Sequence, residues 1–361
     1  MGRNTVRLIT LVMSLLFVST GHAAIRARIV TELDKAELYD ANLFHARKLW
    51  VGRSRRNGNA YYQLQVFDAT GAAIDSRLLS HSVTAIYPAS PTEVLILGRA
   101  ITSGWLVSHY LHTYITRASI QNNRLVIRTT DVTTDYVFDT LGVEPGNSRQ
   151  FLGETGSAAI YAYRPPRGIQ RSAGVVAPGQ LFLVGNALLA LERNSIYPGD
   201  ENLVKIDLTT NTVTRAFSRT QLRNLTRGMV LNTRGRLAFS AQHDDLVHLF
   251  DIGLNQLSES IPIPGGPRGL AQLGHCLVVL SEGSRELRFV DLRDPDRRVV
   301  STWPLPTLEN KLQYPTSVQV DPATGAVFVR SNHVCQECQT TPNSVVRLIE
   351  TTDGTRSACD R

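Results

Sequence analysis

Apolar and polar residues alternate one by one along most of this chain, as in the segments YYQLQVF and VHLF. Alternation with a period of two is typical of β-strands with one buried face, whereas an amphipathic helix repeats every 3.6 residues. After the first 23 residues no segment sustains the helical period. The pattern therefore predicts an all-β protein.

One kind of strand, ending on an acidic turn residue, recurs at intervals of 40 to 59 residues. Its clear copies end at Asp68, Asp207, Asp251, Asp291 and Glu350, and weaker copies lie near Thr116 and Arg164. A second motif keeps step with the first: a short apolar strand, a tight turn around a glycine such as Gly274 or Gly325, and another apolar strand. Repeats of this length are typical of propeller blades.

We therefore predict a seven-bladed β-propeller with four-stranded antiparallel blades, whose units lie between about Glu37 and Gly354. The free alternating segment Ile25–Leu33 precedes the first unit. We expect it to close the ring as the outer strand of the seventh blade. A large β-sandwich and a two-domain β protein are the alternatives.

The segments Val318–Val329 and Leu203–Asn211 carry the repeat motifs most clearly, as VQVDPATGAVFV and LVKIDLTTN. They resemble the propellers described as YVTN, NHL or surface-layer repeats, which are grouped with the large-chain propeller of quinoprotein amine dehydrogenases. The resemblance covers the C-terminal half well and residues 37–177 loosely. It implies a fold and no activity, because that superfamily includes adhesins, scaffolds, lactonases and dehydrogenase subunits. Its motifs carry no active-site residue over to this chain.

The first 23 residues have the organisation of a cleavable secretory signal peptide. Arg3 and Arg7 precede the apolar run Leu8–Val18, and a small-residue cleavage site ends at Ala23. We expect cleavage there, which leaves a single propeller domain over residues 24–361 in the periplasm or outside the cell. A transmembrane anchor is the alternative, but a membrane span takes about 20 apolar residues.

Composition is that of an ordinary globular domain, with 42% hydrophobic and 19% charged residues. The formal net charge is +7, and the positive charge comes almost entirely from arginines scattered in ones and twos. Nucleic-acid binding needs clustered basic residues with interleaved aromatics, and the sequence has no such cluster. We therefore expect a monomer with no nucleic-acid partner and no membrane span, which binds a protein, a glycan or another anionic surface ligand.

The cysteines, Cys276, Cys335, Cys338 and Cys359, favour disulfides in an oxidising compartment. Cys335 and Cys338 lie in an insertion at about residues 331–344 of the seventh unit. They bridge each other, or one of them pairs with Cys359. Cys276 opens the strand CLVVL and is expected to be a partly buried free thiol.

The alternative to a disulfide in this insertion is a metal site or a haem site. His333, Cys335 and Cys338 offer three ligands, but structural zinc takes four. Covalent c-type haem requires a histidine directly after Cys-x-x-Cys, and Gln339 stands there instead. We therefore expect no metal at these residues.

Arg227 and Arg268 each precede a glycine at the start of the inner strand of a blade, where a channel would open. His81 precedes the corresponding strand of the second unit. Such side chains at one channel mouth suit a carboxylate or phosphate ligand. Alternatively, they bond neighbouring loop carbonyls or acids.

No nucleophile elbow and no Ser–His–Asp pairing is evident, so we expect no catalytic residue and a non-catalytic binding or scaffold module. The alternative is a periplasmic enzyme of the lactonase or quinoprotein dehydrogenase kind. Propeller lactonases hold calcium in the channel with acidic and amide side chains. Glu154, Asp244 and Asp245 are candidates, although the role of solvated loop acids suits them better. We therefore expect no cofactor, with calcium left open, whereas the enzyme alternative predicts calcium or a quinone in the channel.

Overall fold

The structure is a computed structural model of the 361-residue chain. It describes residues 25–32, 37–55, 61–103, 109–133, 138, 140–143, 149–154, 159–164, 168–174, 178–192, 202–210, 212–215, 225–231, 235–294, 296, 299–305, 312–334, 344–351 and 359. The predicted signal peptide lies outside these residues.

The described strands form seven four-stranded antiparallel sheets. Six sheets are consecutive in sequence: β2 (Glu37–His45), β3 (Lys48–Arg55), β4 (Tyr61–Asp68) and β5 (Ala73–Leu79); β6 (Ala85–Ser90), β7 (Glu93–Ser103), β8 (His109–Gln121) and β9 (Arg124–Thr133); β10 (Thr140–Val143), β11 (Gln150–Glu154), β12 (Ala159–Arg164) and β13 (Gly168–Gly174); β14 (Pro178–Val184), β15 (Ala187–Glu192), β16 (Asn202–Asp207) and β17 (Val213–Arg215); β18 (Leu225–Leu231), β19 (Arg236–Ala241), β20 (Leu246–Asp251) and β21 (Gln256–Pro262); β22 (Pro267–Leu273), β23 (Cys276–Ser281), β24 (Glu286–Asp291) and β25 (Val299–Pro304). The remaining sheet combines β26 (Leu312–Val320), β27 (Val327–Val334) and β28 (Ser344–Thr351) with β1 (Ile25–Glu32). A 3-10 helix, η1 (Gln242–Asp244), lies between β19 and β20.

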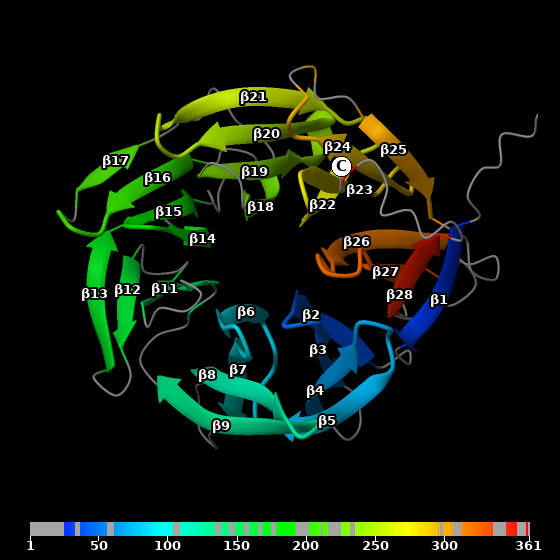
Figure 1. Ribbon diagram of the computed structural model, residues 1–361. Helices are drawn as coiled ribbons and strands as arrows, with labels where there is room; N and C mark the ends of the chain where they lie inside the picture. Colours follow the sequence, from blue (N-terminus) through cyan, green and yellow to red (C-terminus); the bar gives the residue numbers. More distant parts are fainter. Residues whose placement is uncertain are drawn as a thin grey trace, which may run out of the picture.

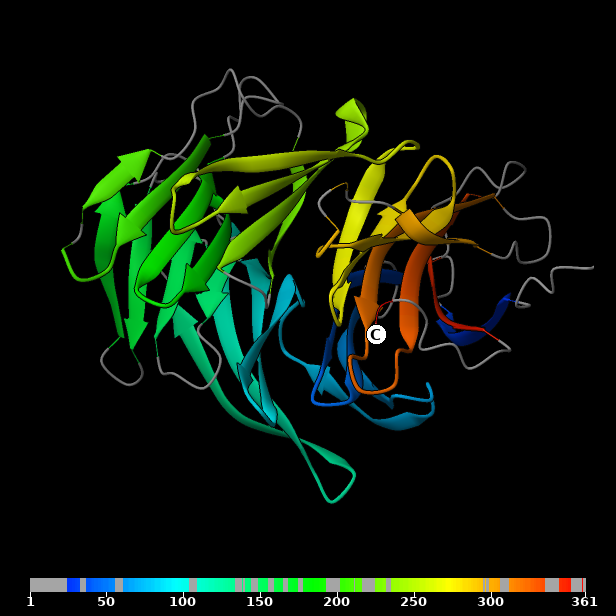
Figure 2. The ribbon, with the colours of Figure 1, turned by 45° about the horizontal axis from the view of Figure 1, so that its top comes forward.

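The sheets stand around a central channel. The innermost strands contact one another in the order β2, β6, β10, β14, β18, β22 and β26, and β26 contacts β2 again. Figure 1 looks down this channel, and Figure 2 shows the tilted ring. The predicted all-β propeller with four-stranded antiparallel sheets is confirmed.

The two ends of the chain meet in one sheet. β1 pairs antiparallel with β28, with Ile25 opposite Thr351 and Arg28 opposite Leu348. The blue β1 and the red β28 lie side by side in Figure 1. The segment before the first repeat therefore forms the outer strand beside the last repeat.

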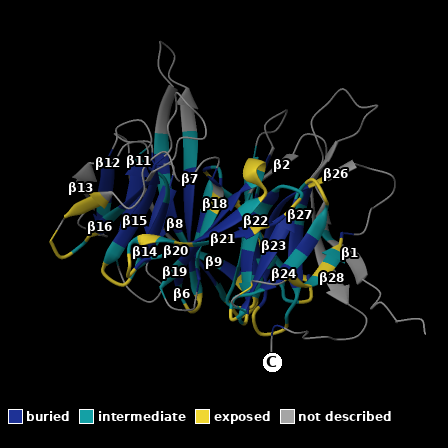
Figure 3. Ribbon diagram, turned by 90° about the horizontal axis from the view of Figure 1, so that it is seen from above, coloured by how far each residue is buried: buried dark blue, intermediate teal, exposed yellow. Residues whose placement is uncertain are grey.

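The hydrophobic core lies between neighbouring sheets. Phe182 of β14 meets Phe239 of β19 edge to face, with ring centroids 5.7 Å apart. Phe289 of β24 packs in one cluster with Val329 of β27 in the next sheet. In Figure 3 buried stretches mark second strands such as β15, β19 and β23, in which nearly every residue is buried. Each sheet is thus stabilised mainly by the apolar faces of its two neighbours.

Glycine supports the tight turns between the first and second strands of a sheet. Gly274 and Gly325 have φ angles of 55° and 75°. This left-handed region favours glycine because a Cβ atom would be strained there. Both are turn positions predicted from the sequence.

Candidate functional site

A cavity of about 400 Å³ lies at the hub of the propeller. Six of the innermost strands line it, together with one residue of β27. Its lining residues are Ala41, Asn42, Leu43, Thr84, Ala85, Ile86, Tyr87, Thr140, Gln180, Leu181, Phe182, Arg227, Gly228, Gln319 and Arg330. This volume falls within the range of small-molecule sites.

Arg227, predicted from its position in the repeat, does line this cavity. It lies in β18 opposite Ser240 of β19, and it is exposed to solvent. The other predicted arginine, Arg268, is not among the cavity residues. Its Nη1 lies 2.5 Å from Glu282 Oε1, with the Arg268 side chain 34% exposed. Arg268 therefore pairs with a nearby acid, which was the alternative to ligand binding for this residue.

The two arginines occupy different positions relative to the β-bulge near the start of their strands. Near the start of β18 the register shifts between Leu225 and Arg227, and near the start of β22 it shifts between Pro267 and Gly269. Arg268 is itself the extra residue of its bulge, whereas Arg227 follows its bulge and keeps a cross-strand partner. The prediction that the two Arg-Gly pairs occupy equivalent places is wrong by one residue.

The backbones of the two arginines still meet across the seam between their sheets. Ser240 Oγ lies 3.3 Å from the carbonyl oxygen of Arg227 and 3.3 Å from that of Arg268. Ser240 is fully buried. A single hydroxyl thus ties β18, β19 and β22 together beside the channel.

His81, predicted to bind ligand at a channel mouth, is instead buried and is not among the residues that line the cavity. Its side chain is 1% exposed and stacks on Tyr114 at 4.8 Å between ring centroids. Nδ1–H donates to the carbonyl oxygen of Ser82 at 2.7 Å, so neutral Nε2 accepts from Thr116 Oγ1 at 2.8 Å. Burial lowers the pKa of His81. The residue is a structural histidine within the sheet β6–β9.

Arg330 is a cavity residue that the sequence reasoning missed. It lies in β27 opposite Ser317 of β26, and its Nε donates to Thr316 Oγ1 at 2.9 Å. Arg330 ends the motif TSVQVDPATGAVFVR, which predicted a hairpin and gave no reason to single out its last residue. A signal was present, since an arginine on an otherwise apolar strand needs a polar surface.

Other polar residues of the cavity wall join neighbouring sheets. Gln180 Oε1 of β14 accepts from the backbone N–H of Gly228 in β18 at 2.9 Å. In the same way Gln319 Oε1 accepts from Phe44 N–H at 3.1 Å. These bonds satisfy backbone donors across the seams between neighbouring sheets, so the two glutamines have a structural role.

The calcium candidates do not come together. Asp245 Oδ1 accepts from the backbone N–H of Gly266 at 2.7 Å, and Glu154 accepts from the hydroxyl of Tyr161 at 3.4 Å. Asp244 lies in η1. Among the described residues no group of three or more His, Cys, Asp or Glu side chains is placed to hold a metal ion.

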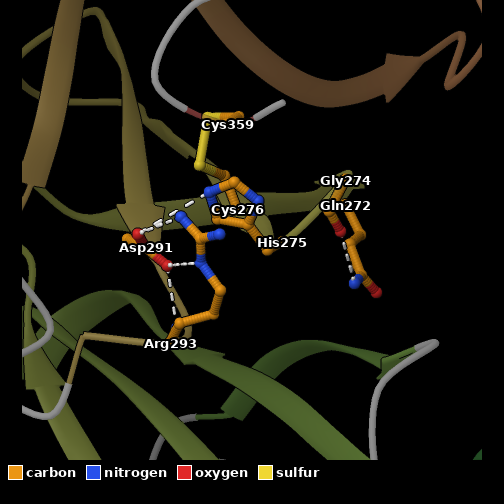
Figure 4. Close-up of polar contacts among 7 residues, drawn as sticks. All are labelled: Gln272, Gly274, His275, Cys276, Asp291, Arg293 and Cys359. Carbon is orange, nitrogen blue, oxygen red and sulfur yellow. Dashed lines mark hydrogen bonds and ion pairs between the residues drawn. A yellow bond between two sulfur atoms is a disulfide. The ribbon is translucent and has the colours of Figure 1, made fainter. Parts of the chain in front are cut away.

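The described cysteines form a disulfide between Cys276 and Cys359, with Cα atoms 5.3 Å apart (Figure 4). Both are almost completely buried. The prediction of a free thiol at Cys276 is therefore wrong. It failed because Cys359 follows the last strand and returns to the neighbouring sheet, a path that sequence spacing does not reveal. Cys335 and Cys338 lie outside the described residues.

A small polar cluster flanks this disulfide. Figure 4 shows Arg293 and His275 both directed at the carboxylate of Asp291. Arg293 Nη2 lies 3.1 Å from Asp291 Oδ2, and His275 Nε2 lies 3.6 Å from the same oxygen. Hydrogen bonding from Arg293 lowers the pKa of Asp291. The cluster holds the turn that leads into Cys276.

Comparison with known proteins identifies the fold and no family. No protein-family model matches the chain, and no curated protein is significantly similar to it in sequence. The structure is similar to the WD40 repeats of RRP9, with a TM-score of 0.63, 9% identity and coverage of 90% of this chain and 97% of that one. It is also similar to U3-55K, with a TM-score of 0.60, 9% identity and coverage of 88% and 98%. At this identity the likeness concerns the β-propeller fold alone.

Within the described part of the chain, no helix has the length and apolar character needed to cross a bilayer.

Proposed function

We propose that this protein is a non-catalytic β-propeller that binds a protein or glycan partner through one face. The face is the one that carries the loops before the innermost strands and between the second and third strands. The observation that carries the proposal is that, on this face, the described loops of the sheets β18–β21 and β22–β25 are held in place by hydrogen bonds between these two sheets. Binding sites are commonly built on loops positioned by a rigid scaffold.

The loop network is clearest where the sheets β18–β21 and β22–β25 meet. Glu282 accepts from Gln242 Nε2 and from Arg268 Nη1, both at 2.5 Å. Asp245 Oδ1 holds the N–H of Gly266 on the same face. Loops fixed before binding lose less conformational entropy when a partner docks. The exposed residues of η1 and of the loop after β23 therefore form a prepared surface.

A photocrosslinking experiment tests this face. A photoreactive amino acid is placed at His243, which is exposed in η1, and in a matched control at Leu254, which is 66% exposed in the turn at the opposite face. In cells of the source organism we expect an adduct of defined mass from position 243 and none from position 254. Adducts from neither position, or from 254 alone, would contradict the proposal. A glycan array with the purified protein separates a glycan from a protein partner.

The competing proposal is a calcium- or quinone-dependent propeller enzyme in the periplasm. What favours it is the resemblance of Val318–Val329 to the YVTN and quinoprotein propellers. Metal analysis and an absorption spectrum of the mature protein separate the two proposals. Stoichiometric calcium or a quinone band would support the enzyme and overturn the binding module.

We propose further that the mature chain works in the periplasm or outside the cell. The buried disulfide between Cys276 and Cys359 supports this location, because such bonds persist in oxidising compartments. We also propose that the ring is a complete set of seven blades closed by β1. The contacts of β26 with β2 and the pairing of β1 with β28 support a closed ring.

A further inference from the structure

The hub cavity combines two guanidinium groups with a wall that carries no carboxylate among its described residues. Arg227 and Arg330 are the charged residues of that wall. The remaining polar groups are amides and hydroxyls, and Leu181, Phe182 and Ile86 supply apolar surface. Positive charge enclosed by low-dielectric walls attracts anions more strongly than the same charge on an open surface.

The two arginines stand at the same height in the channel. Arg227 directly follows the bulge of β18 and pairs with Ser240. Ser317 directly follows the bulge of β26, and its cross-strand partner is Arg330. The bulges place Arg227 and Ser317 at equivalent positions of their inner strands, so Arg330 is level with both. One sheet, β22–β25, separates the two contributors.

A third donor lies beside Arg330. Asn42 Oδ1 accepts from Ser317 Oγ at 2.9 Å, which fixes the orientation of the amide. Its Nδ2 group is buried and has no acceptor among the described residues. A buried donor without an acceptor is energetically costly, so it favours any ligand that supplies one. Asn42 and Arg330 line the cavity from the two sides of the seam between β26 and β2.

We propose that the hub cavity binds an oxyanion, a carboxylate or phosphate group that accepts hydrogen bonds from Arg227, Arg330 and Asn42. Guanidinium groups bind such oxyanions through charge-assisted hydrogen bonds. The group comes from a small free anion or from an acidic side chain that a partner inserts into the channel. This site is separate from the proposed binding face, and either proposal stands without the other.

Calorimetric titration of the full mature protein tests the site. The probes are inorganic phosphate, succinate and a short peptide with one glutamate, measured at low ionic strength. We expect Arg227→Gln and Arg330→Gln each to weaken binding about tenfold to a hundredfold, the loss of one charge-assisted contact. The matched control is Arg268→Gln, in the second Arg-Gly pair, which removes the same charge outside the cavity wall and is expected to change affinity less than about twofold.

Each outcome decides the proposal. Phosphate or succinate binding that both hub variants lose assigns the site to a small free anion, and binding of the peptide alone assigns it to a partner's side chain. No binding of any probe, or equal weakening by Arg268→Gln, overturns the site. Circular dichroism and thermal unfolding of every variant show whether it is folded, and if a glutamine variant is unfolded, Arg→Lys at the same position replaces it.

Discussion

Cys276 and Cys359 are joined although they lie 83 positions apart in the sequence, and the bond ties the end of the chain to the sheet before its last repeat. Cys276 begins β23, whereas Cys359 follows β28 of the next sheet. Both belong to the apolar cluster that fills the seam between these sheets. The disulfide therefore links the last sheet to the preceding sheet. The pairing of β28 with β1, in contrast, joins the two ends of the chain within the last sheet.

Replacing Cys359 by serine should lower the free energy of unfolding by about 2–4 kcal/mol, because the disulfide closes a long loop in the unfolded chain. Denaturant titration of the purified variant measures the loss. The reduced wild-type protein should show a similar loss. Non-reducing peptide mapping provides the direct check: a linked peptide that contains Cys359 without Cys276 would contradict the assignment.

Stability should fall as the pH is lowered from 7 to 5, and His81 should be one cause. Burial lowers the pKa of His81 below its ordinary value of 6.5. The unfolded chain therefore takes up a proton at a pH where the folded protein holds His81 neutral. Its contribution is complete above pH 6.5 and is lost as the pH falls, by at most about 1.4 kcal/mol per pH unit.

The variant His81→Gln should flatten this pH dependence in thermal unfolding. Some dependence should persist, because burial also lowers the pKa of His248. Carboxyl groups with lowered pKa, such as Asp75 and Asp291, act below pH 4 and leave this window unaffected. An unchanged slope between pH 7 and 5 in the variant would refute the assignment to His81.

Gly98 is required by the packing of His81. A Cβ atom at this position of β7 would overlap the carbonyl oxygen of Ser82 and Nδ1 of His81. Gly98→Ala should therefore destabilise the protein by about 1–3 kcal/mol or more. Gly253→Ala is the matched control, since the nearest atom to its added Cβ lies 3.4 Å away. Equal unfolding midpoints for the two variants would show that the sheet adapts.

The fold was predictable because its determinants are local. Alternation with a period of two identifies the strands, and a glycine with positive φ marks turns such as the one at Gly274. The repeat length then leaves few architectures that the strands can form. These steps need only local patterns and the spacing at which they recur along the sequence.

The site was less predictable because it depends on register and on long-range contacts. Arg227 follows the bulge of its strand and lines the cavity. Arg268 is one position earlier relative to its own bulge, and it pairs with Glu282. The sequence Arg-Gly is the same in both places. Arg330 reaches the hub from a second strand, and its neighbour Asn42 is nearly the whole chain away. Identical residues in two repeats therefore do not imply equivalent positions around a channel.

Tyr87→Phe should weaken the seam between the sheets β6–β9 and β10–β13. The Tyr87 hydroxyl accepts from the backbone N–H of Leu141 at 3.1 Å, and burial raises the pKa of Tyr87, so the phenol stays neutral. The variant keeps the ring and removes the acceptor, which leaves a buried N–H unsatisfied. The expected loss is about 1–3 kcal/mol. Hydrogen exchange should report it locally, as faster exchange of the Leu141 amide with little change at Gly228, whose N–H is held by Gln180 at another seam. Exchange that accelerates equally at both amides would indicate global destabilisation and would contradict a bond confined to this seam.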